Sequence, residues 1–519
     1  MINKISNSRP KILLIYPPNS GARPGMKGIY FPLGIGYIAS VLRKDYNLKV
    51  HDFNYDYCIG YYSGSYYVES ILRNHEYDFL LIGGVFPKYK CLKEIIEISR
   101  KISKAKIIIG GSYLKASVKV ISNYLKADYY VIGDGEEVVV KLLECLISNK
   151  STKIVDGIAY HNGSDVWLNK PVAPLVNIDD IPFPTRDLLN FDYYKRYFAL
   201  GNPLLYTAFV IASRGCPLNC FFCNPALGRK VRVRSPENIL EEIILLQKDY
   251  NCKYIYFHDE VLLGGTKKRV VNFCEYILSK SKYRFLWGGG TNPRMLDKET
   301  LSLMKKAGCI KMGLGIESGS QTILKEMRKN NNLEQIKNVV AYCNKIGIET
   351  QFSLLTNTFS ETRDTLLETR NYLKYFNKFF FRQPFSINYI IPVHGTDIYS
   401  EAKQKGLTDN DDLKNILSLD ESSRYALRHN LTNMKTDYFT NLVDDINGEL
   451  ANDYFSKHPI QSLMYKTTNL THFRLKETLL SLSLKNIRPV VEGLLWTLCR
   501  GNDNSIIGKI YKKLVYNNV

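Results

Sequence analysis

Residues 213–225 read Ser-Arg-Gly-Cys-Pro-Leu-Asn-Cys-Phe-Phe-Cys-Asn-Pro, so that Cys216, Cys220 and Cys223 form a CxxxCxxC triplet. Thiolates are soft ligands that select iron-sulfur centres, and three of them in one short loop can hold three corners of a cubic [4Fe-4S] cluster. The fourth iron then lacks a protein ligand and stays open to substrate or cofactor. The triplet therefore predicts a cluster with one exchangeable iron.

The triplet stands between a strand and a helix. The apolar run 206–212 precedes it, and a basic stretch leads from it to Ser235-Pro236, a typical helix start. Such a junction is an active-site position in α/β folds. The alternatives are a zinc site and unligated core cysteines. A structural zinc site requires four ligands, and the next cysteine, Cys252, stands alone.

The CxxxCxxC spacing, with the aromatic Phe222 directly before the third cysteine, resembles the radical S-adenosylmethionine (SAM) superfamily. The resemblance implies that the amino and carboxylate groups of SAM chelate the open iron. It also implies that one electron cleaves the sulfonium to a 5′-deoxyadenosyl radical. Cys216, Cys220 and Cys223 are then the metal ligands, and Phe222 lies beside SAM.

Length and composition fit a multidomain protein with large cores. The chain has 519 residues, 45% of them hydrophobic, and contains no uncharged apolar run of about 18 residues. The N-terminal stretch lacks the apolar core of a signal peptide, so we expect a cytoplasmic protein with no transmembrane segment. The cysteines outside the triplet suit a reducing compartment, and we expect small buried hydrophobes at positions 58, 91, 145, 252, 274, 309, 343 and 499.

The formal net charge of +20 indicates an anionic partner or a lysine-rich solvated surface. The lysines are dispersed, and no basic stripe interleaved with stacking aromatic residues occurs. We therefore expect no binding to nucleic acid.

The first 150 residues alternate apolar strand-like runs with helical patterns. Short buried strands alternating with helices predict a doubly wound α/β sheet, which binds ligands beyond the carboxyl ends of its strands. Glycines stand at those ends, where they let the backbone approach a large ligand closely or turn with positive φ. The predicted strands are 11–16, 49–53, 78–85, 106–110 and 128–132.

Three segments in order resemble the cobalamin-binding domain that is fused upstream of many radical SAM enzymes. They are Phe-Pro-Leu-Gly-Ile-Gly-Tyr-Ile-Ala at 31–39, Gly110-Gly111 after the fourth run, and Gly-Asp-Gly-Glu-Glu at 133–137 after the fifth. The resemblance implies that residues 1–150 form a Rossmann-like cobalamin-binding domain. The cobalamin contacts that it implies are Gly84, Val85, Gly110, Gly111, Ser112, Gly133, Gly135 and Glu136.

The N-terminal segment departs from the family pattern at the cobalt ligand. The Asp-x-His-x-x-Gly motif, whose histidine ligates cobalt in methionine synthase-like domains, is absent, and Phe86-Pro87-Lys88 occupies the corresponding loop. The histidines of this segment, His51 and His75, are expected at or before strand starts, the wrong end of the sheet. We therefore expect cobalamin to bind without a histidine on cobalt.

The rest of the chain divides into three parts. Residues 151–204 are rich in proline and predict an extended linker with a short β-pair, and residues 406–519 predict a mainly helical region with amphipathic helices at 475–487 and 490–498. Between them, residues 205–405 match the open (β/α)6 barrel of the radical SAM family, with functional groups at the strand ends. Its six predicted strands are 207–212, 253–258, 284–288, 310–316, 349–354 and 386–391.

Polar residues and glycines follow the second, third and fourth of these strands. In the family, the corresponding segments line the SAM site, and Glu317 is the strongest single candidate after the cysteines. Its alternative role is that of a first-turn carboxylate favoured by the helix dipole. The SAM contacts implied by the resemblance are Phe222, Asp259, Glu260, Gly289, Thr291, Glu317 and Ser318.

The fifth and sixth strand ends follow the pattern less closely. Where relatives commonly read Gly-Leu-Pro-Gly-Glu-Thr, this chain keeps only Glu361-Thr362, so the adenine-side loop is expected to differ in shape. The run Pro-Val-His-Gly-Thr at 392–396 is close to the usual Pro-x-x-Gly-Thr. His394 is there either a proton-transfer group or an ordinary loop histidine.

The resemblance implies an enzyme that uses a [4Fe-4S] cluster, SAM and cobalamin to transfer a methyl group to an unactivated carbon. It also implies an electron donor such as flavodoxin or ferredoxin, and a small-molecule, lipid or peptide substrate that the sequence does not name. Two alternatives stay open. One is a radical cyclase or rearrangement enzyme like the anaerobic magnesium-protoporphyrin ester cyclases, and the other is a non-catalytic iron-sulfur or cobalamin sensor.

Overall fold

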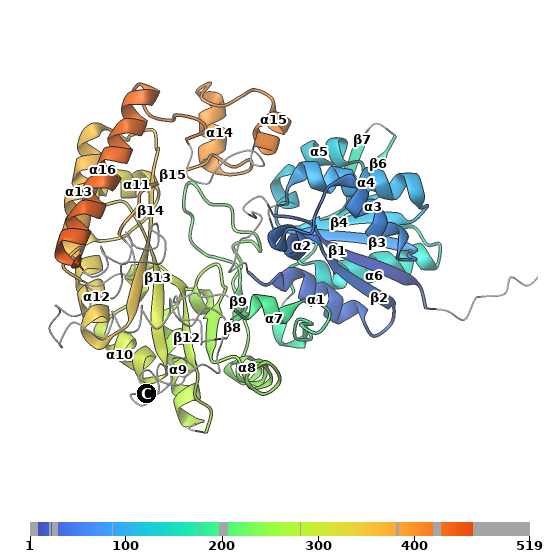
Figure 1. Cartoon of the computed structure of the whole chain (residues 1–519), viewed down its shortest axis with the longest axis horizontal. Helices are drawn as coiled ribbons and strands as arrows, with labels where there is room; N and C mark the ends of the chain where they lie inside the picture. The colour runs from blue at the N-terminus through green and yellow to red at the C-terminus, as the bar shows by residue number, and fades with distance from the viewer. Residues whose placement is uncertain are drawn as a thin grey trace, which may run out of the picture.

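Two sheets organise the chain, and helices cover both of them (Figure 1). The computed structural model describes residues 9–19, 22, 30–85, 87–163, 165–175, 177–196, 206–280, 282–379, 384–418 and 427–459. In Figure 1 the N-terminal sheet is blue to cyan and the second sheet runs from green to orange. The prediction of a doubly wound domain followed by a partial barrel is confirmed.

The first sheet has the strand order β2-β1-β3-β4-β5-β6-β7. β1 to β5 are parallel, whereas β6 and β7 add an antiparallel pair at one edge. Each strand predicted within residues 1–150 is present. The bounds are Lys11–Tyr16 (β1), Asn47–Asp52 (β2), Phe79–Gly84 (β3), Lys106–Gly111 (β4), Tyr129–Val131 (β5), Ile158–Asn162 (β6) and Asp165–Leu168 (β7).

Helices bury both faces of this sheet. Successive side chains of β1 point to opposite faces, so Leu14 packs in one apolar cluster with α1 and α6, while Leu13 packs in another with α3, α4 and α5. Burial on both faces explains why the strands read as continuous apolar runs. The helices are Leu33–Leu42 (α1), Phe53–Ile59 (α2), Ser65–Arg73 (α3), Tyr89–Ile102 (α4), Leu114–Leu125 (α5) and Gly135–Ile147 (α6).

The second sheet is a six-stranded parallel half-barrel with the order β15-β14-β13-β12-β11-β8. Its strands are Thr207–Val210 (β8), Tyr254–Phe257 (β11), Leu286–Thr291 (β12), Cys309–Glu317 (β13), Glu349–Thr356 (β14) and Asn388–Tyr389 (β15). The helices cover the outer face in Figure 1. They are Pro236–Tyr250 (α8), Lys267–Ser279 (α9), Lys298–Lys306 (α10), Gln321–Glu326 (α11), Leu333–Ile346 (α12) and Arg363–Phe376 (α13). Asp397–Gln404 (α14) instead packs against Phe221 of the cysteine loop.

A small antiparallel hairpin that the sequence did not predict closes the cysteine loop. Ser213–Arg214 (β9) pairs with Arg232–Val233 (β10), so residues 215–231 form a loop pinned at both ends. The helix start predicted after this loop is confirmed, because the Ser235 hydroxyl caps α8 by accepting from the Asn238 N–H at 3.2 Å.

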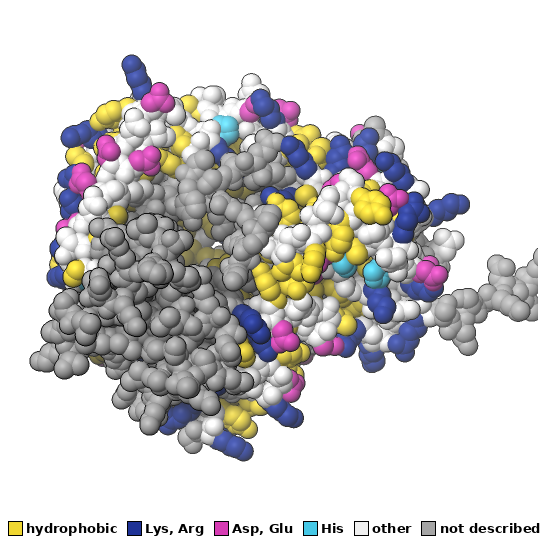
Figure 2. Space-filling model, viewed as in Figure 1, with side chains coloured by type: hydrophobic (Ala, Val, Ile, Leu, Met, Phe, Trp, Pro, Cys, Tyr) yellow, Lys and Arg dark blue, Asp and Glu magenta, His cyan; other side chains and the backbone are white. Residues whose placement is uncertain are grey.

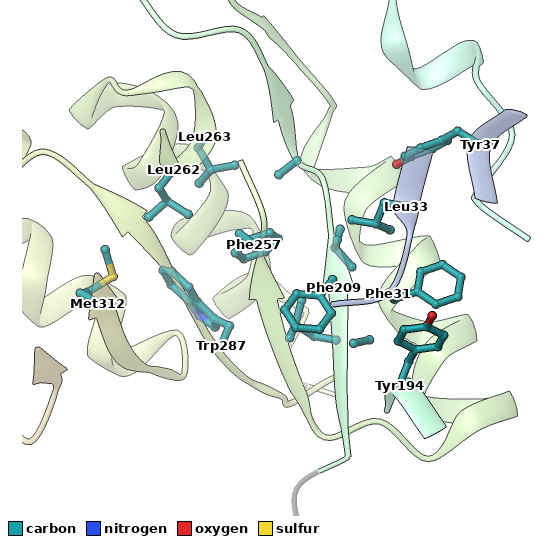
Figure 3. Close-up of a cluster of buried hydrophobic side chains, with 14 of the residues drawn as sticks. Phe31, Leu33, Tyr37, Tyr194, Phe209, Phe257, Leu262, Leu263, Trp287 and Met312 are labelled. Carbon is teal, nitrogen blue, oxygen red and sulfur yellow. The ribbon is translucent and has the colours of Figure 1, made fainter. Parts of the chain in front are cut away.

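One apolar cluster continues from the first sheet into the half-barrel. Phe31 and Tyr37 from the N-terminal part and Tyr194 from the short helix Phe191–Tyr194 (α7) approach Phe209 of β8, with Trp287 of β12 beyond (Figure 3). The linker also carries the buried Arg186, which donates to Glu242 of α8 at 2.7 Å. The two sheets therefore share a core.

The C-terminal part is helical where the structure describes it. Asp412–Leu417 (α15) is followed by Thr436–Lys457 (α16), which packs along α13. The helices predicted at 475–487 and 490–498 lie outside the described residues. No helix in the described ranges is long and apolar enough to cross a membrane.

The structure shows where the charged side chains and the single cysteines lie. Lysine and arginine side chains are dispersed over the face seen in Figure 2, while hydrophobic side chains gather over the N-terminal part on the side that faces the barrel. Of the single cysteines, Cys91 is half-buried and Cys499 lies outside the described residues. The others are buried, as predicted: Cys58, Cys145, Cys252, Cys274, Cys309 and Cys343.

Candidate cluster and cofactor site

The cysteine loop is held in shape by its own backbone. The Cys216 N–H donates to the Gly228 carbonyl at 3.0 Å, and the Cys223 N–H donates to the Cys220 carbonyl at 3.2 Å. Gly215 has φ +89°, and a Cβ there would lie 2.4 Å from the Lys230 carbonyl oxygen. Only glycine fits this crossing of the two loop ends, which explains the Arg-Gly-Cys sequence.

The three thiols influence one another. Desolvation is the main cause that raises the pKa of Cys223 to about 11, and the neighbouring thiols of Cys220 and Cys216 contribute to the same rise. Burial is likewise the main cause that raises the pKa of Cys216. The loop supplies three thiols, one fewer than the four ligands of a structural zinc site. Three neighbouring thiols on one loop suit the corners of a larger cubic cluster.

Asp259 and Glu260, at the end of β11, hold this loop. Asp259 accepts hydrogen bonds from the N–H groups of Ala212 and Ser213, at 2.7 and 3.1 Å, and from the Ser213 hydroxyl at 2.7 Å. Its second oxygen also accepts from the Leu263 N–H at 2.9 Å. Glu260 accepts from the Leu227 N–H at 3.1 Å. The structure thus gives both carboxylates a part in fixing the cysteine loop, and their contact with SAM stays a prediction.

We expect Asp259→Asn to destabilise the fold around the cluster loop. Burial raises the pKa of Asp259 to about 6, so the group is a carboxylate at neutral pH, and an amide NH₂ in its place would face N–H donors. The free energy of unfolding should fall by about 1–3 kcal/mol, measured by urea denaturation. Asp297→Asn is the control, since Asp297 caps the exposed start of α10 and Asn caps equally well. Equal stability of the two variants would contradict this role.

Glu317 lies at the carboxyl end of β13 in a strained conformation. Its φ is +67°, and the pairing of β13 with β14 shifts register between Gly315 and Glu317. The side chain is buried, with one oxygen 2.8 Å from Lys329 Nζ, whereas Oε2 has no hydrogen-bond partner. A buried carboxylate oxygen without a donor and a left-handed non-glycine residue both mark a site shaped for a ligand.

Lys329 completes this pair and connects it to the cysteine loop. Its ammonium lies 5.9 Å from the centre of the Phe222 ring, directly before Cys223 in the chain. Although burial opposes its charge, Glu317 and the thiols of Cys220 and Cys223 raise the pKa of Lys329. A Cβ on Gly315 would lie 3.0 Å from Lys329 Nζ, so this glycine leaves room for the ion pair. The sequence analysis missed Lys329, because nothing in its local pattern separates it from a surface lysine.

Two glycines open the concave face of the half-barrel beside this pair. Gly290 of β12 pairs with Gly313 of β13, and no atom lies within 4 Å of a Cβ built on Gly290. Trp287 packs against Phe273 of α9 on the outer face, so strand alternation puts Gly289 and Thr291 on that outer face as well. Open space is thus found at Gly290, and the contact of Gly289 and Thr291 with SAM stays a prediction.

Ser318 has a structural partner in the described chain. Its hydroxyl lies 2.9 Å from Thr369 Oγ1 and accepts from the Ser320 N–H at 3.1 Å, which secures the turn into α11. The retained Glu361-Thr362 is also structural. Glu361 accepts from the Thr365 hydroxyl at 2.7 Å, and Thr362 forms a capping box with Thr365 at the start of α13.

His394 lies where three parts of the chain meet. The following residue, Gly395, has φ +88°, and its Cβ would lie 2.1 Å from the Ala116 side chain of α5. The same Cβ would lie 3.4 Å from Asn224 of the cysteine loop. The imidazole lies 3.7 Å from an Asp412 oxygen. The end of β15 thus touches both the N-terminal domain and the cysteine loop.

Glycines form the carboxyl ends of β3 and β4 in the first sheet. Gly84 pairs with Gly111, whose φ is +142° and whose Cβ would lie 2.1 Å from the Gly84 carbonyl oxygen. Val85 follows with 53% of its surface exposed, and the Ser112 hydroxyl donates to its carbonyl at 3.2 Å. At Gly110 an added Cβ would meet no atom nearer than 4.0 Å, and the contact of these residues with cobalamin stays a prediction.

The remaining predicted cobalamin contacts pack against the protein itself. A Cβ on Gly133 would lie 3.1 Å from Val172, and one on Gly135 would lie 3.1 Å from Ile38, so packing accounts for both glycines. Glu136 is buried and forms an ion pair with Arg214 at 2.6 Å. The sequence analysis missed this arginine.

The placement of His51 was predicted wrongly. β2 ends at Asp52, so His51 lies near the carboxyl end of the edge strand rather than at its start, and its Nε2 lies 2.8 Å from Asp56 of α2. His75 precedes β3, as expected, with Nδ1 2.8 Å from the Ile71 carbonyl. Both rings have protein partners, although the reason given for excluding His51 does not hold. Phe86 of the predicted loop lies outside the described residues.

Comparison with known proteins agrees with this arrangement. Residues 210–373 match the family model of the radical SAM superfamily. The chain is 28% identical to an uncharacterised methyltransferase of Pyrococcus horikoshii over 70% of its own length and 78% of the relative. It is 25% identical to the anaerobic magnesium-protoporphyrin IX monomethyl ester cyclase of Cereibacter sphaeroides over 69% of its own length and 59% of the relative.

A solved structure shares the fold of both parts. It is that of the radical SAM methyltransferase TsrM of Kitasatospora setae, determined with cobalamin and a [4Fe-4S] cluster bound. The TM-score is 0.61 at 15% identity, and the match covers 77% of this chain and 75% of TsrM. Residues 210–373 therefore form a radical SAM domain, and the two sheets together have the fold of TsrM.

Proposed function

We propose that the chain is a cobalamin-dependent radical SAM enzyme that transfers a methyl group to an unactivated carbon. The observation that carries the proposal is the strained Glu317, which has one unpartnered oxygen and pairs with the buried Lys329, itself beside Phe222 of the cysteine loop. A carboxylate and an ammonium at that position fit the polar groups of SAM. The methyltransferase relatives support the type of transfer.

The residues have separate tasks in this proposal. Cys216, Cys220 and Cys223 would hold the cluster, Glu317 and Lys329 would orient SAM, and Gly290 with Gly313 would leave room for it. Asp259 and Glu260 keep the cysteine loop in place. The bound cofactors supply an electron and a methyl group, while the surrounding protein excludes water from the reacting groups.

The proposed division of the chain follows from these tasks. Residues 1–150 would bind cobalamin at the edge formed by Gly84, Val85, Gly110, Gly111 and Ser112, and residues 151–204 would connect them to the barrel. Residues 205–405 would hold the cluster and SAM, and residues 406–519 would cover the barrel. A flavodoxin or ferredoxin would supply the electron to a cytoplasmic enzyme with a small-molecule, lipid or peptide substrate.

We expect protein made in cells supplied with cobalamin to retain it, with no protein nitrogen on the lower face of cobalt. Both described histidines of the N-terminal domain have protein partners, so neither imidazole is placed for cobalt. Electron paramagnetic resonance of the cob(II)alamin form should therefore lack axial coupling from a protein nitrogen. Nitrogen coupling that changes when the protein is labelled with ¹⁵N would show that a protein nitrogen binds cobalt. That result would refute the expectation.

Methyl transfer and cyclisation are distinguished by the mass of the product. Radical cyclisation is the second candidate function, because the cyclase of Cereibacter sphaeroides matches the chain about as well as the methyltransferases do. Metabolites from cells with the active chain should be compared with those from cells carrying the Cys216→Ala variant. A product heavier by one methylene supports methyl transfer, whereas loss of hydrogen without added carbon supports the cyclase reaction.

A further inference from the structure

A buried ionic network joins the cysteine loop to the N-terminal domain. Arg214 ends β9, two residues before Cys216, and its guanidinium donates to both oxygens of Glu136 at 2.6 and 3.3 Å. It also donates to Asp134 Oδ1 at 3.1 Å. All three side chains are at most 8% exposed. Bidentate arginine-carboxylate pairs fix orientation as well as distance.

A second arginine binds the other end of the loop to the same carboxylate. Arg232, in the facing strand β10, contacts Asp134 Oδ2 and donates to the Leu227 carbonyl in the loop at 3.0 Å. Asp134 therefore bridges the two strands that close the cysteine loop. Two arginines balance two acids, so the buried network is neutral.

The acidic side of the network lies beside the end of β4, where cobalamin is proposed to bind. Asp134 directly precedes α6 and Glu136 is the second residue of that helix, at the carboxyl edge of the first sheet, and β5 pairs with β4 at Gly110. Asp134 occupies the N-cap position of α6 yet makes no capping hydrogen bond with that helix, although Asp is among the best capping residues. Its carboxylate is used for the two arginines of the other domain instead.

A neighbouring helix makes an independent contact with the same loop. Lys115 of α5, which follows the Gly110-Gly111-Ser112 turn, donates to the Pro225 carbonyl at 3.3 Å. The ends of β4 and β5 are thus both attached to the loop that carries the cysteines. In Figure 1 β9 lies at the junction of the two parts.

We propose that Arg214 is a positioning residue through which the cobalamin-binding edge and the cluster loop are coupled. A movement of the β5–α6 turn is transmitted through the Glu136 carboxylate and the Arg214 guanidinium to the backbone at Cys216. Binding of cobalamin at one sheet and of SAM at the other then affect each other by the same factor, as linkage requires. This inference rests on the proposed function only for the identity of the two ligands.

The test compares Glu136→Gln with Asp187→Asn in full-length, anaerobically reconstituted protein. Gln keeps the shape and removes the charge from Arg214. Asp187 is the matched control, because it accepts two hydrogen bonds from Arg43 of α1, at 3.0 and 2.8 Å, and this pair is exposed. Glu136→Asp, which keeps the charge, is the rescue variant. If Glu136→Gln does not fold, Arg214→Lys takes its place, because Lys keeps the positive charge but cannot form the bidentate pair with Glu136.

The first readout needs no cobalamin. The electron paramagnetic resonance spectrum of the reduced cluster should shift in Glu136→Gln, return toward that of the unaltered protein in Glu136→Asp, and stay unchanged in Asp187→Asn. If the spectra of Glu136→Gln and the unaltered protein coincide, the proposal is overturned. This measurement reports the position of the cluster loop even if the chain binds no cobalamin. Failure to bind cobalamin would count against the proposed function but not against the contact between Arg214 and the loop.

The second readout is the Kd for SAM with and without hydroxocobalamin. In the unaltered protein and in Asp187→Asn, cobalamin should change the Kd by about five-fold or more. In Glu136→Gln the two Kd values should coincide, although both ligands still bind. An equal ratio in all three proteins would overturn the coupling.

Discussion

Replacing Cys216, Cys220 and Cys223 together by Ala is expected to abolish the iron-sulfur absorbance and the formation of 5′-deoxyadenosine. The three thiols sit on one loop whose ends are pinned by the β9–β10 pair. No other three metal-ligating side chains of the described residues are grouped to take over their role. The measurement is the visible spectrum and iron content after anaerobic reconstitution, followed by chromatography of the products of SAM.

The matched control removes three cysteines that serve the core. Cys252, Cys274 and Cys309 are buried in the half-barrel, so their replacement by Ala removes a small apolar volume and leaves the loop intact. This variant should bind the cluster as the unaltered protein does. A full cluster in the variant without the loop cysteines would remove the basis of the assignment.

The second large effect is expected from Glu317→Gln, which should weaken SAM binding with the cluster retained. The change removes the charge that faces Lys329 and replaces the unpartnered oxygen of a carboxylate. Loss of a charged hydrogen bond to a buried ligand costs about 1.5–3 kcal/mol, which corresponds to a Kd raised roughly ten- to hundred-fold. The Kd is measured by titration of SAM into cluster-loaded protein.

Glu349→Gln is the control for this prediction. Lys311 of β13 and Glu349 of β14 form a similar pair with their charged atoms 3.4 Å apart, at the amino end of β14 and away from the cysteine loop. Its loss should leave the Kd for SAM unchanged. If Glu317→Gln binds SAM like the control, Glu317 is no more than a buried partner of Lys329.

Local sequence patterns were sufficient for the fold because each strand of both sheets is a short apolar run between helices. The cysteines and Glu317 were also predictable, since their position at strand ends follows from the order of the elements. The doubly wound sheet and the six parallel strands were thus fixed by information that lies within about ten residues of each strand.

Residues that act through distant partners were not predictable in this way. The resemblance implied a cobalamin contact for Glu136, but its ion-pair partner Arg214 could not be predicted, because it is far away in the sequence. Lys329 reaches the site because α11 and the turn after it bring it back over Gly315. Gly289 was preferred to Gly290 because the outer and concave faces of β12 cannot be distinguished in a run of three glycines.

The most direct test of the account is to measure the products of SAM in a reduced, cobalamin-loaded sample supplied with extract of cells that lack the active chain. Methyl transfer through both cofactors consumes SAM in two ways, so the account predicts both 5′-deoxyadenosine and S-adenosylhomocysteine, with neither formed by the variant without the three loop cysteines. Formation of 5′-deoxyadenosine without S-adenosylhomocysteine would contradict methyl transfer and support the cyclase-type reaction. Formation of neither product by a protein that holds its cluster would contradict the assignment as a radical enzyme.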